Sequence, residues 1–350
     1  MTLISTFVAA HRDALDLAGH GVTTGARQVT LLPRYAESRH VVVLVLNDAG
    51  DRVALVAKVP RRPWDTAGVC HEAAMLERLH RVWPAGRDSI PRVVFSGTWR
   101  ATPILVETAV PGRVLTHRGF RRAPEKFEDA YLRWVESLPV TGGTADDPDW
   151  FDRLVGRPLD LLEAATDEAS ARNLARRTRD LLEPLRDLDC ATVFEHGDLS
   201  SPNLLWHRQG SRVGVIDWEL ALDRGLPGHD AAVFLAFAAF ARAKAHGVRP
   251  ELAAFRRAFL DPDGWAWPVY RAHLRPRGVA PEHDERLLLA AWARYALQVF
   301  PRLLTGPGCG EPAAVAKDAL ELFRTGRNTA VWRMVSDHLA RPGPSILLRR

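Results

Sequence analysis

The sequence predicts an α+β fold with two lobes, a small N-terminal lobe built on an antiparallel sheet and a larger, mostly helical C-terminal lobe. Two patterns and the chain length support this prediction. Most β-rich segments fall in the first 110 residues, and helical patterns dominate the remainder. A chain of 350 residues with 47% hydrophobic content can bury a sizeable core, arranged as two lobes rather than one. We therefore place the lobes at 1–110 and 111–350.

The expected N-terminal lobe contains a short helix near the N-terminus, five strands and one longer helix. The longer helix is expected because apolar residues recur at helical spacing at Val69, Ala73, Leu76 and Leu79. The last strand ends at a Pro-Gly break, Pro111-Gly112. We expect the strands at about 29–32, 40–46, 52–59, 91–97 and 103–110.

The expected C-terminal lobe is helical over about 125–188 and 230–339. Breaks are expected at Pro139–Pro148, Asp261–Gly264, Pro276–Pro281 and Gly306–Pro312. The apolar run 231–241 is too short to span a bilayer and indicates a core helix. Between the helical regions, 191–194 is expected to be a buried strand, and 204–206 with 213–216 a hairpin turned at 208–211.

One stretch in this β-rich region has residue types that suit chemistry. His196, Gly197, Asp198 and Asn203 have the form H-G-D-x-x-x-x-N, and Asp217 ends the second hairpin strand. Phosphoryl transfer needs a carboxylate that orients the attacking hydroxyl, and an amide and a second carboxylate that hold magnesium on the phosphates. Asn and Asp supply the oxygen ligands that magnesium prefers. The alternative is an Asp-rich loop whose His196 and Asn203 only cap backbone groups.

A lysine near the end of an upstream strand fits the same chemistry. Lys58 ends the run V-A-L-V-A-K and is one of four lysines among 47 basic residues, so its place indicates a need for a compact ammonium. Such a lysine needs a carboxylate partner that aims it at phosphates. Glu72 and Glu77 are candidates, and Glu72 is favoured because it lies beside the apolar stripe. A lysine extending to solvent from a strand end is the alternative.

These motifs resemble the aminoglycoside phosphotransferase/choline kinase family of small-molecule kinases, which have a protein-kinase-like fold. The resemblance covers about 23–333 and is sharpest at His196–Asn203 and at Ile216–Glu219; it continues through the G-x-P-x-x-D segment at Gly225–Asp230. It implies that Asp198 is catalytic and that Asn203 and Asp217 hold Mg²⁺. It also implies that Asp230 braces the catalytic loop, which His196 begins, and that Lys58, paired to Glu72, contacts the phosphates of ATP or GTP.

Order along the chain suggests further nucleotide contacts. The strand before Pro111 would lead into a hinge, so the Glu107 carbonyl and the Ala109 amide are expected to contact the base. The sequence has no Gly-rich phosphate loop at 33–39, a departure that makes Ser38 or its amide the candidate there. Ser200-Ser201-Pro202 also departs from the commoner triplet, which leaves the chemistry intact but alters the expected acceptor pocket.

Composition excludes several classes of partner. The net charge is +5, yet arginines are interleaved with acids and form no long basic run, so no nucleic-acid partner is expected. No membrane partner is expected either. The three cysteines lack metal spacing, and the N-terminus lacks the cationic region of a signal peptide; a cytoplasmic location is expected.

The acceptor is less well defined. An acidic cluster at Asp146, Asp147, Asp149 and Asp152 can pair with an amine or form a solvated loop, and Trp265, Trp267 and Trp292 fit a pocket or the core. We expect an ATP-dependent O-phosphotransferase acting on a hydroxyl of an antibiotic or other natural product. A primary-metabolite kinase (choline, homoserine, methylthioribose or sugar) and a nucleotide-binding pseudokinase are the alternatives. The sequence leaves the oligomeric state open.

Overall fold

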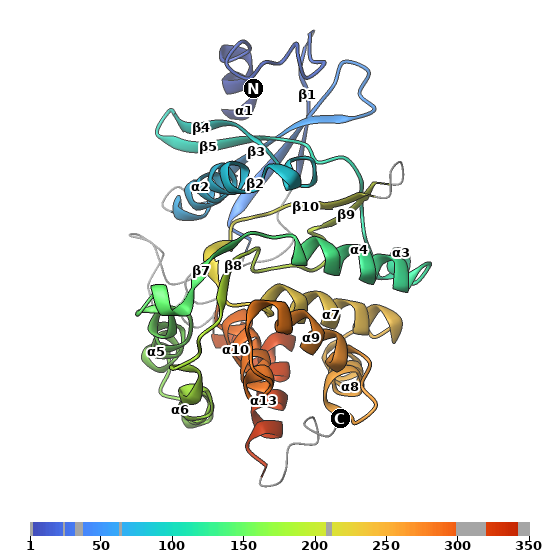
Figure 1. The fold of residues 1–350 in the computed structure, drawn as a ribbon. Helices are drawn as coiled ribbons and strands as arrows, with labels where there is room; N and C mark the ends of the chain where they lie inside the picture. The colour runs from blue at the N-terminus through green and yellow to red at the C-terminus, as the bar shows by residue number, and fades with distance from the viewer. Residues whose placement is uncertain are drawn as a thin grey trace. The chain divides into compact units, whose positions relative to one another are not determined.

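The computed structural model describes residues 3–23, 25–31, 38–62, 65–207, 212–298 and 320–341. These residues form two compact units. The first takes its described residues from Met1–Arg113 and Leu205–Ala221, and the second takes the others. The division falls at Arg113, close to the expected boundary at 110/111, but Leu205–Ala221 returns to the first unit. Figure 1 shows the predicted fold class, a small antiparallel-sheet lobe and a larger helical lobe.

The first unit is built on a five-stranded antiparallel sheet. Its order is β1-β2-β3-β5-β4, which places β2, β3 and β5 in its interior; β3 and β5 have buried residues on both faces, whereas the buried valines of β2, Val43 and Val45, share one face. In register, Lys58 of β3 lies opposite Val42 of β2 and Leu105 of β5. The strands are β1 (Arg27–Leu31), β2 (His40–Leu46), β3 (Val53–Pro60), β4 (Val93–Trp99) and β5 (Thr102–Thr108).

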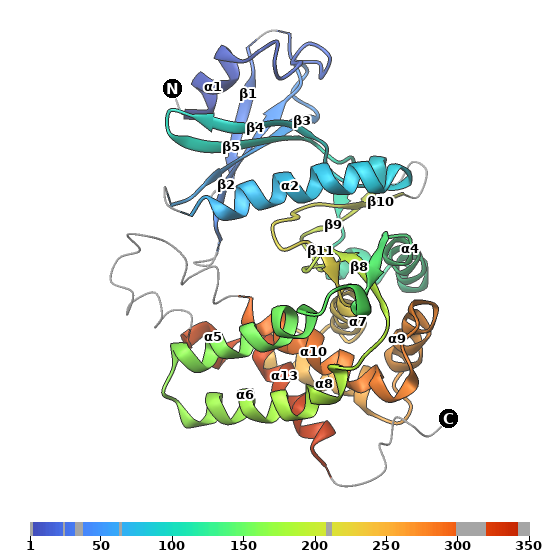
Figure 2. The same ribbon diagram turned by 60° about the vertical axis from the view of Figure 1, so that its left-hand side comes forward.

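Two helices cover this sheet. The N-terminal helix α1 (Leu3–Ala10) places Phe7 in a core cluster with Val45 and Leu55. Helix α2 (Ala67–Val82) runs along the sheet in Figure 2, and its Val69 and Ala73 pack with Leu105. A 3₁₀ helix follows it at Pro84–Ser89. The apolar stripe of α2 therefore faces the sheet, as its spacing predicts.

The hairpin predicted after the H-G-D motif is present. It consists of β9 (Leu204–His207) and β10 (Arg212–Val215); its predicted turn at 208–211 lies outside the described residues. With the two-residue strand β6 (Arg113–Val114) it forms a three-stranded sheet of order β10-β9-β6.

The second unit combines a small sheet with a helical core. The sheet has the order β11-β8-β7, formed by β11 (Leu222–Gly225), β8 (Ala191–Glu195) and β7 (Val140–Gly143). Helix α7 (His229–Arg242) is buried at every position from His229 to Ala241, as expected of a core helix. Among the described residues, the other α-helices are α3 (His117–Phe120), α4 (Pro124–Glu136), α5 (Arg157–Ala165), α6 (Ala169–Leu182), α8 (Val248–Phe255), α9 (Ala266–Leu274), α10 (Asp284–Leu297) and α13 (Arg327–Leu339).

The predicted breaks in the helical region have different structures. Strand β7 lies within the first, Pro139–Pro148, because its backbone pairs with β8. Asp261–Gly264 and Pro276–Pro281 separate helices as expected, whereas Gly306–Pro312 lies outside the described residues. Across the described ranges, no helix combines the length and the apolar character needed to cross a bilayer.

Candidate active site

The first unit gathers three carboxyl groups around one lysine. Nζ of Lys58 lies 2.5 Å from Oε1 of Glu72, 3.3 Å from Oδ1 of Asp217 and 3.4 Å from Oε1 of Glu107. Lys58, Glu72 and Glu107 are buried, and the Asp217 side chain is 40% exposed. Local structure explains the cluster, since Glu72 lies on the buried face of α2, and Glu107 and Lys58 lie on adjacent strands. The expected Lys58–Glu72 pair is thus formed.

Burial and mutual charge set the protonation of this cluster. Burial alone would lower the pKa of Lys58, but Glu107, Glu72 and Asp217 together raise it well above its ordinary value. Burial raises the pKa of Glu72 to about 8, against the opposing effect of the ammonium, and it also raises the pKa of Glu107. The lysine therefore keeps its proton, whereas the raised pKa values of Glu72 and Glu107 favour the neutral forms of these two carboxyl groups.

Asp217 occupies a distinctive backbone position, two residues beyond the end of β10. Its φ is +71°, in the left-handed region, which Asp tolerates better than most residues. The next residue, Trp218, is fully buried, and its N–H donates to Oε1 of Glu72 at 2.9 Å. Glu72 thus holds both Lys58 and the backbone beside Asp217.

The first unit also contains oxygen donors that fit a hard cation. One ligand atom from each of His40, Glu72 and Asp217 lies within 4.8 Å of the others. Oε2 of Glu72 and Nε2 of His40 are buried without a hydrogen-bond partner in the described structure. Burial and the charge of Lys58 lower the pKa of His40 to about 4, so its ring is neutral at pH 7. The Asp217 and Glu72 carboxyl groups beside a neutral imidazole supply the oxygen donors that magnesium prefers, with Glu72 losing its proton on binding.

The second unit positions Asp198 in the loop after β8. Its Oδ2 accepts from Nδ2 of Asn203 at 3.1 Å, and its Oδ1 accepts from the hydroxyls of Tyr295 at 2.6 Å and Ser200 at 3.0 Å. The Asn203 amide nitrogen also donates to the Asp198 carbonyl at 3.1 Å, so both of these hydrogen bonds use the donor side of the amide. Asp198 is half-buried, so its carboxylate remains accessible.

The start of α7 braces this loop. Both carboxylate oxygens of Asp230 accept backbone hydrogen bonds, from His196 at 2.7 Å and from Gly197 at 2.9 Å. The Asp198 N–H donates to Nδ1 of His196 at 3.2 Å. Burial raises the pKa of Asp230 to about 7, with Glu195 adding to the rise and the two amides opposing it. His196 and Asp230 thus make the contacts expected of supporting residues.

Sequence reasoning missed two residues of this region, both on α10. Tyr295 bonds Asp198, and Arg294 forms a bidentate pair with the buried Glu195, with separations of 2.5 and 3.1 Å. Arg294 lowers the pKa of Glu195 against the effect of burial. Both lie about a hundred positions beyond the motif, in a helix that is mostly buried. The sequence feature that could have indicated them is the pair of adjacent polar residues, Arg294 and Tyr295, within an otherwise apolar helix.

The predicted nucleotide contacts of the first unit have mixed surroundings. The Ala109 N–H donates to the Ala54 carbonyl at 3.3 Å, so its predicted contact with a base requires that this bond be exchanged. The Glu107 backbone lies within β5, and its side chain is the part that joins the cluster. Ser38 is half-buried, and its side chain makes no hydrogen bond to another described residue. These contacts stay predictions.

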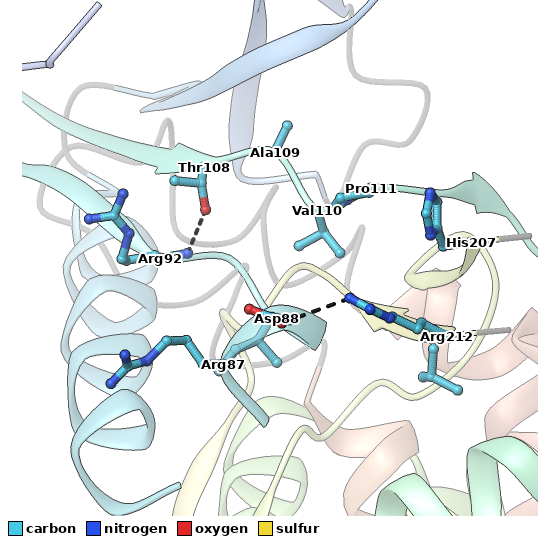
Figure 3. A pocket seen from close by; sticks show the side chains of 11 residues that line it. Arg87, Asp88, Arg92, Thr108, Ala109, Val110, Pro111, His207 and Arg212 are labelled. Atoms are coloured by element: carbon cyan, nitrogen blue, oxygen red, sulfur yellow. Dashed lines mark hydrogen bonds and ion pairs between the residues drawn. The ribbon is translucent and has the colours of Figure 1, made fainter. Parts of the chain in front are cut away.

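A cavity of about 330 Å³ borders the segment after β5 within the first unit. Thr108, Ala109 and Val110 line one side of it. In Figure 3, Arg212 points toward Asp88, 3.9 Å away, whereas Arg87 and Arg92 point away from that pair. Arg212 is therefore near an opposite charge, and the guanidinium groups of Arg87 and Arg92 lie away from that pair.

The fold is similar to that of several solved small-molecule kinases. Choline kinase LicA from Streptococcus pneumoniae is 13% identical, covers 91% of this chain and 99% of its own, and has a TM-score of 0.53. An ethanolamine kinase from Plasmodium vivax is 10% identical, with 96% and 92% covered and a TM-score of 0.52. A mutant of aminoglycoside phosphotransferase APH(4)-Ia in complex with AMP-PNP and hygromycin B is 16% identical, with 93% and 99% covered and a TM-score of 0.52.

Sequence comparison defines the family. No curated protein sequence matches this chain. The model of the phosphotransferase enzyme family matches residues 31–304, which include both the Lys58 cluster and the Asp198 loop. The chain belongs to the phosphotransferase enzyme family and is a small-molecule kinase.

Proposed function

We propose that this protein transfers the γ-phosphoryl group of ATP or GTP to a hydroxyl of a small molecule. The observation that carries the proposal is the Asp198 carboxylate, which is accessible and held by Asn203, Ser200 and Tyr295. A carboxylate held in this way can orient a hydroxyl and accept its proton during transfer. The acceptor is an antibiotic or other natural product in this proposal, and a primary metabolite is the alternative.

The first unit supplies the groups that bind a nucleotide. Lys58 contacts the α- and β-phosphates, since Glu72 and Glu107 hold its ammonium in place. Asp217 and the amide oxygen of Asn203 would hold Mg²⁺, and Glu72 and His40 lie beside Asp217. When bound, the metal neutralises charge that develops on the phosphates. Glu107 and Ala109 are expected at the base, and Ser38 at the phosphates.

Detection of a product tests this proposal directly. The purified protein is incubated with Mg-ATP or Mg-GTP and a panel of hydroxylated antibiotics and metabolites, and mass spectrometry detects a gain of one phosphoryl group. We expect transfer to at least one alcohol. If no alcohol is phosphorylated although the nucleotide binds, the pseudokinase alternative replaces this proposal.

The metal assignment needs a separate measurement. Asp217→Ala should abolish magnesium-dependent nucleotide binding in calorimetry, because the phosphate charge then lacks the metal that compensates it. Asp223→Ala provides a control, since this half-buried carboxylate on β11 belongs to the second unit. Wild-type affinity of the Asp217→Ala variant for Mg-ATP would exclude Asp217 as a ligand.

A further inference from the structure

A small cavity beside the Asp198 loop suggests the chemical class of the acceptor, an inference that rests on the proposed function. The cavity has a volume of about 50 Å³ and lies within the second unit. One face of α7 lines it, with residues spaced at three and four positions. The residues that define its chemistry are Phe237, Phe240, Trp292, Tyr295, His117 and Arg327.

The cavity and the Asp198 carboxylate share two side chains. Tyr295 and Ser200 line the cavity, and both donate hydrogen bonds to Oδ1 of Asp198, at 2.6 and 3.0 Å. If Asp198 orients the reacting hydroxyl of an acceptor, the part of the acceptor next to that hydroxyl would therefore lie at this cavity. The chemistry of the lining restricts that substituent.

The charge of the lining disfavours an ammonium group. Among the described residues that line the cavity there is no carboxylate, and the cation is Arg327. Its guanidinium lies over the ring of Phe240, 5.2 Å from the centroid, and 3.6 Å from a carboxylate oxygen of Glu251. A ligand cation would meet this guanidinium and find one aromatic face already occupied.

The other polar groups do not compensate a ligand cation either. Burial lowers the pKa of His117, with His246 and Arg327 adding to the effect, so its ring is neutral at pH 7. Asp198 keeps its charge but is not among the residues that line the cavity, which the hydroxyl-bearing Ser200 and Tyr295 border instead. The cavity thus offers apolar surface, a neutral ring and a guanidinium.

Three of the four carboxylates in the acidic cluster that the sequence offered as an amine site have partners within the protein. Asp147 pairs with Arg153 at 2.6 Å, and Asp146 accepts from the Gly143 amide at 3.0 Å. Asp152 lies 3.5 Å from Arg186. These carboxylates therefore have structural partners and supply no obvious cation site.

We propose that the acceptor presents an uncharged, apolar group next to its reacting hydroxyl, not an ammonium. Aromatic rings also attract quaternary ammonium ions, but here the guanidinium of Arg327, whose charge Glu251 offsets only in part, already takes the face of Phe240. The acceptor is thus a neutral alcohol at this position, in contrast to a choline-like or polyamine substrate.

A pair of alcohols of the same shape tests this charge preference. Choline and 3,3-dimethylbutan-1-ol differ in one atom, a quaternary nitrogen in place of a quaternary carbon. With a saturating Mg-nucleotide, we expect kcat/KM for phosphorylation of the neutral alcohol to exceed that of choline at least about tenfold. Equal or greater transfer to choline, or no transfer to either alcohol, overturns the proposal.

Variants identify the group responsible. Arg327→Gln should narrow the preference for the neutral alcohol, because the cation that repels choline is gone. Arg333→Gln is the matched control on the same helix, where the guanidinium lies over Phe323 instead. Melting temperatures establish that both variants fold. An unchanged preference in folded Arg327→Gln contradicts the role of Arg327.

A binding measurement separates this proposal from the proposed function. Within the described structure Nε1 of Trp292 has no hydrogen-bond partner, so its indole resonance, assigned with Trp292→Phe, reports on the cavity. We expect 3,3-dimethylbutan-1-ol to shift this resonance and choline at equal concentration to leave it unchanged. This measurement needs no phosphoryl transfer, so it tests the cavity by itself. If the wild-type protein bound no nucleotide in the presence of magnesium, the proposed function would be refuted and the inference about the cavity would not. A shift with choline alone, or with neither alcohol, contradicts the proposal.

Discussion

Asp198 accepts hydrogen bonds from an amide and two hydroxyls, and this pattern fixes its orientation without replacing its charge. Asp198→Asn should lower kcat by about 10²–10⁴-fold, because the carboxylate that accepts the proton is lost. Nucleotide affinity in calorimetry should stay within a few-fold of wild type, since the substitution is nearly isosteric. A variant with near wild-type turnover would remove Asp198 from the mechanism.

Lys58 tests the need for a compact ammonium. Lys58→Arg should reduce turnover about 10²-fold despite keeping the charge, because a planar guanidinium cannot fit among Glu72, Glu107 and Asp217 without displacing one of them. Glu72→Gln should cause a milder loss. Steady-state kinetics would show this, with Lys244→Arg at an exposed lysine as the control. Near wild-type kinetics for Lys58→Arg would place the nucleotide site elsewhere.

The residues around these side chains differ in how far the sequence reveals them. Asp198, Asn203 and Asp217 stand out because these polar residues, at a fixed spacing, lie between or after apolar strands. Tyr295 does not, since it reaches Asp198 from a helix 97 positions away. Glu107 is intermediate. Its position in the strand is predictable, but the contact of its carboxylate with Lys58 depends on the register of β3 with β5.

At the scale of elements, β11 and β8 approach closely beside the Asp198 loop. A Cβ added at Gly225 would lie 2.5 Å from Cβ of Glu195, which is closer than real side chains approach. Gly225→Ala should therefore destabilise the protein by about 1–3 kcal/mol, the usual cost of overpacking. Urea unfolding measures this change.

Gly143→Ala is a matched control in the same sheet. Its Cβ would meet neighbours at 3.5 Å or more, an ordinary contact. We expect Gly143→Ala to unfold within about 1 kcal/mol of wild type. Equal stability of the two variants would show that β11 can shift away from Glu195.

Sequence patterns missed the short strands β7 and β11. β7 and β11 have four residues each, and β7 has the sequence V-T-G-G, which is typical of a turn. They are strands because β8 offers hydrogen bonds on both of its edges. Helices α2 and α7 were predictable, since a stripe and an apolar run are local properties of the sequence.

At the scale of the whole molecule, the sequence predicts two units. It does not predict which later segment of the chain belongs to the first unit. Leu205–Ala221 follows the Asp198 loop along the chain yet belongs to the first unit. Its membership follows from contacts such as Trp218 with Glu72, which are separated by 146 positions. Because this segment belongs to the first unit, Asp217 lies beside Lys58. The same contacts therefore decide both the division of the chain into units and the composition of the Lys58 cluster.

Stability of the whole molecule should depend on pH through a buried histidine. Burial, with a further contribution from Arg277, lowers the pKa of His273 from 6.5 to about 3, although Glu136 lies 3.9 Å away. Between about pH 3 and pH 6.5 the unfolded chain therefore binds more protons than the folded protein does. The stabilisation is complete above about pH 6.5 and is lost progressively as the pH falls toward 3.

His273→Phe should remove this part of the pH dependence. At pH 5 the wild type should have lost on the order of 2 kcal/mol through His273, because each pKa unit corresponds to about 1.4 kcal/mol. Urea unfolding at pH 7 and pH 5 would show a smaller decrease for His273→Phe than for wild type. His246→Phe, at an exposed histidine, should keep the wild-type decrease. Equal decreases in all three proteins would mean that His273 titrates normally in the folded state, and so that its environment admits water.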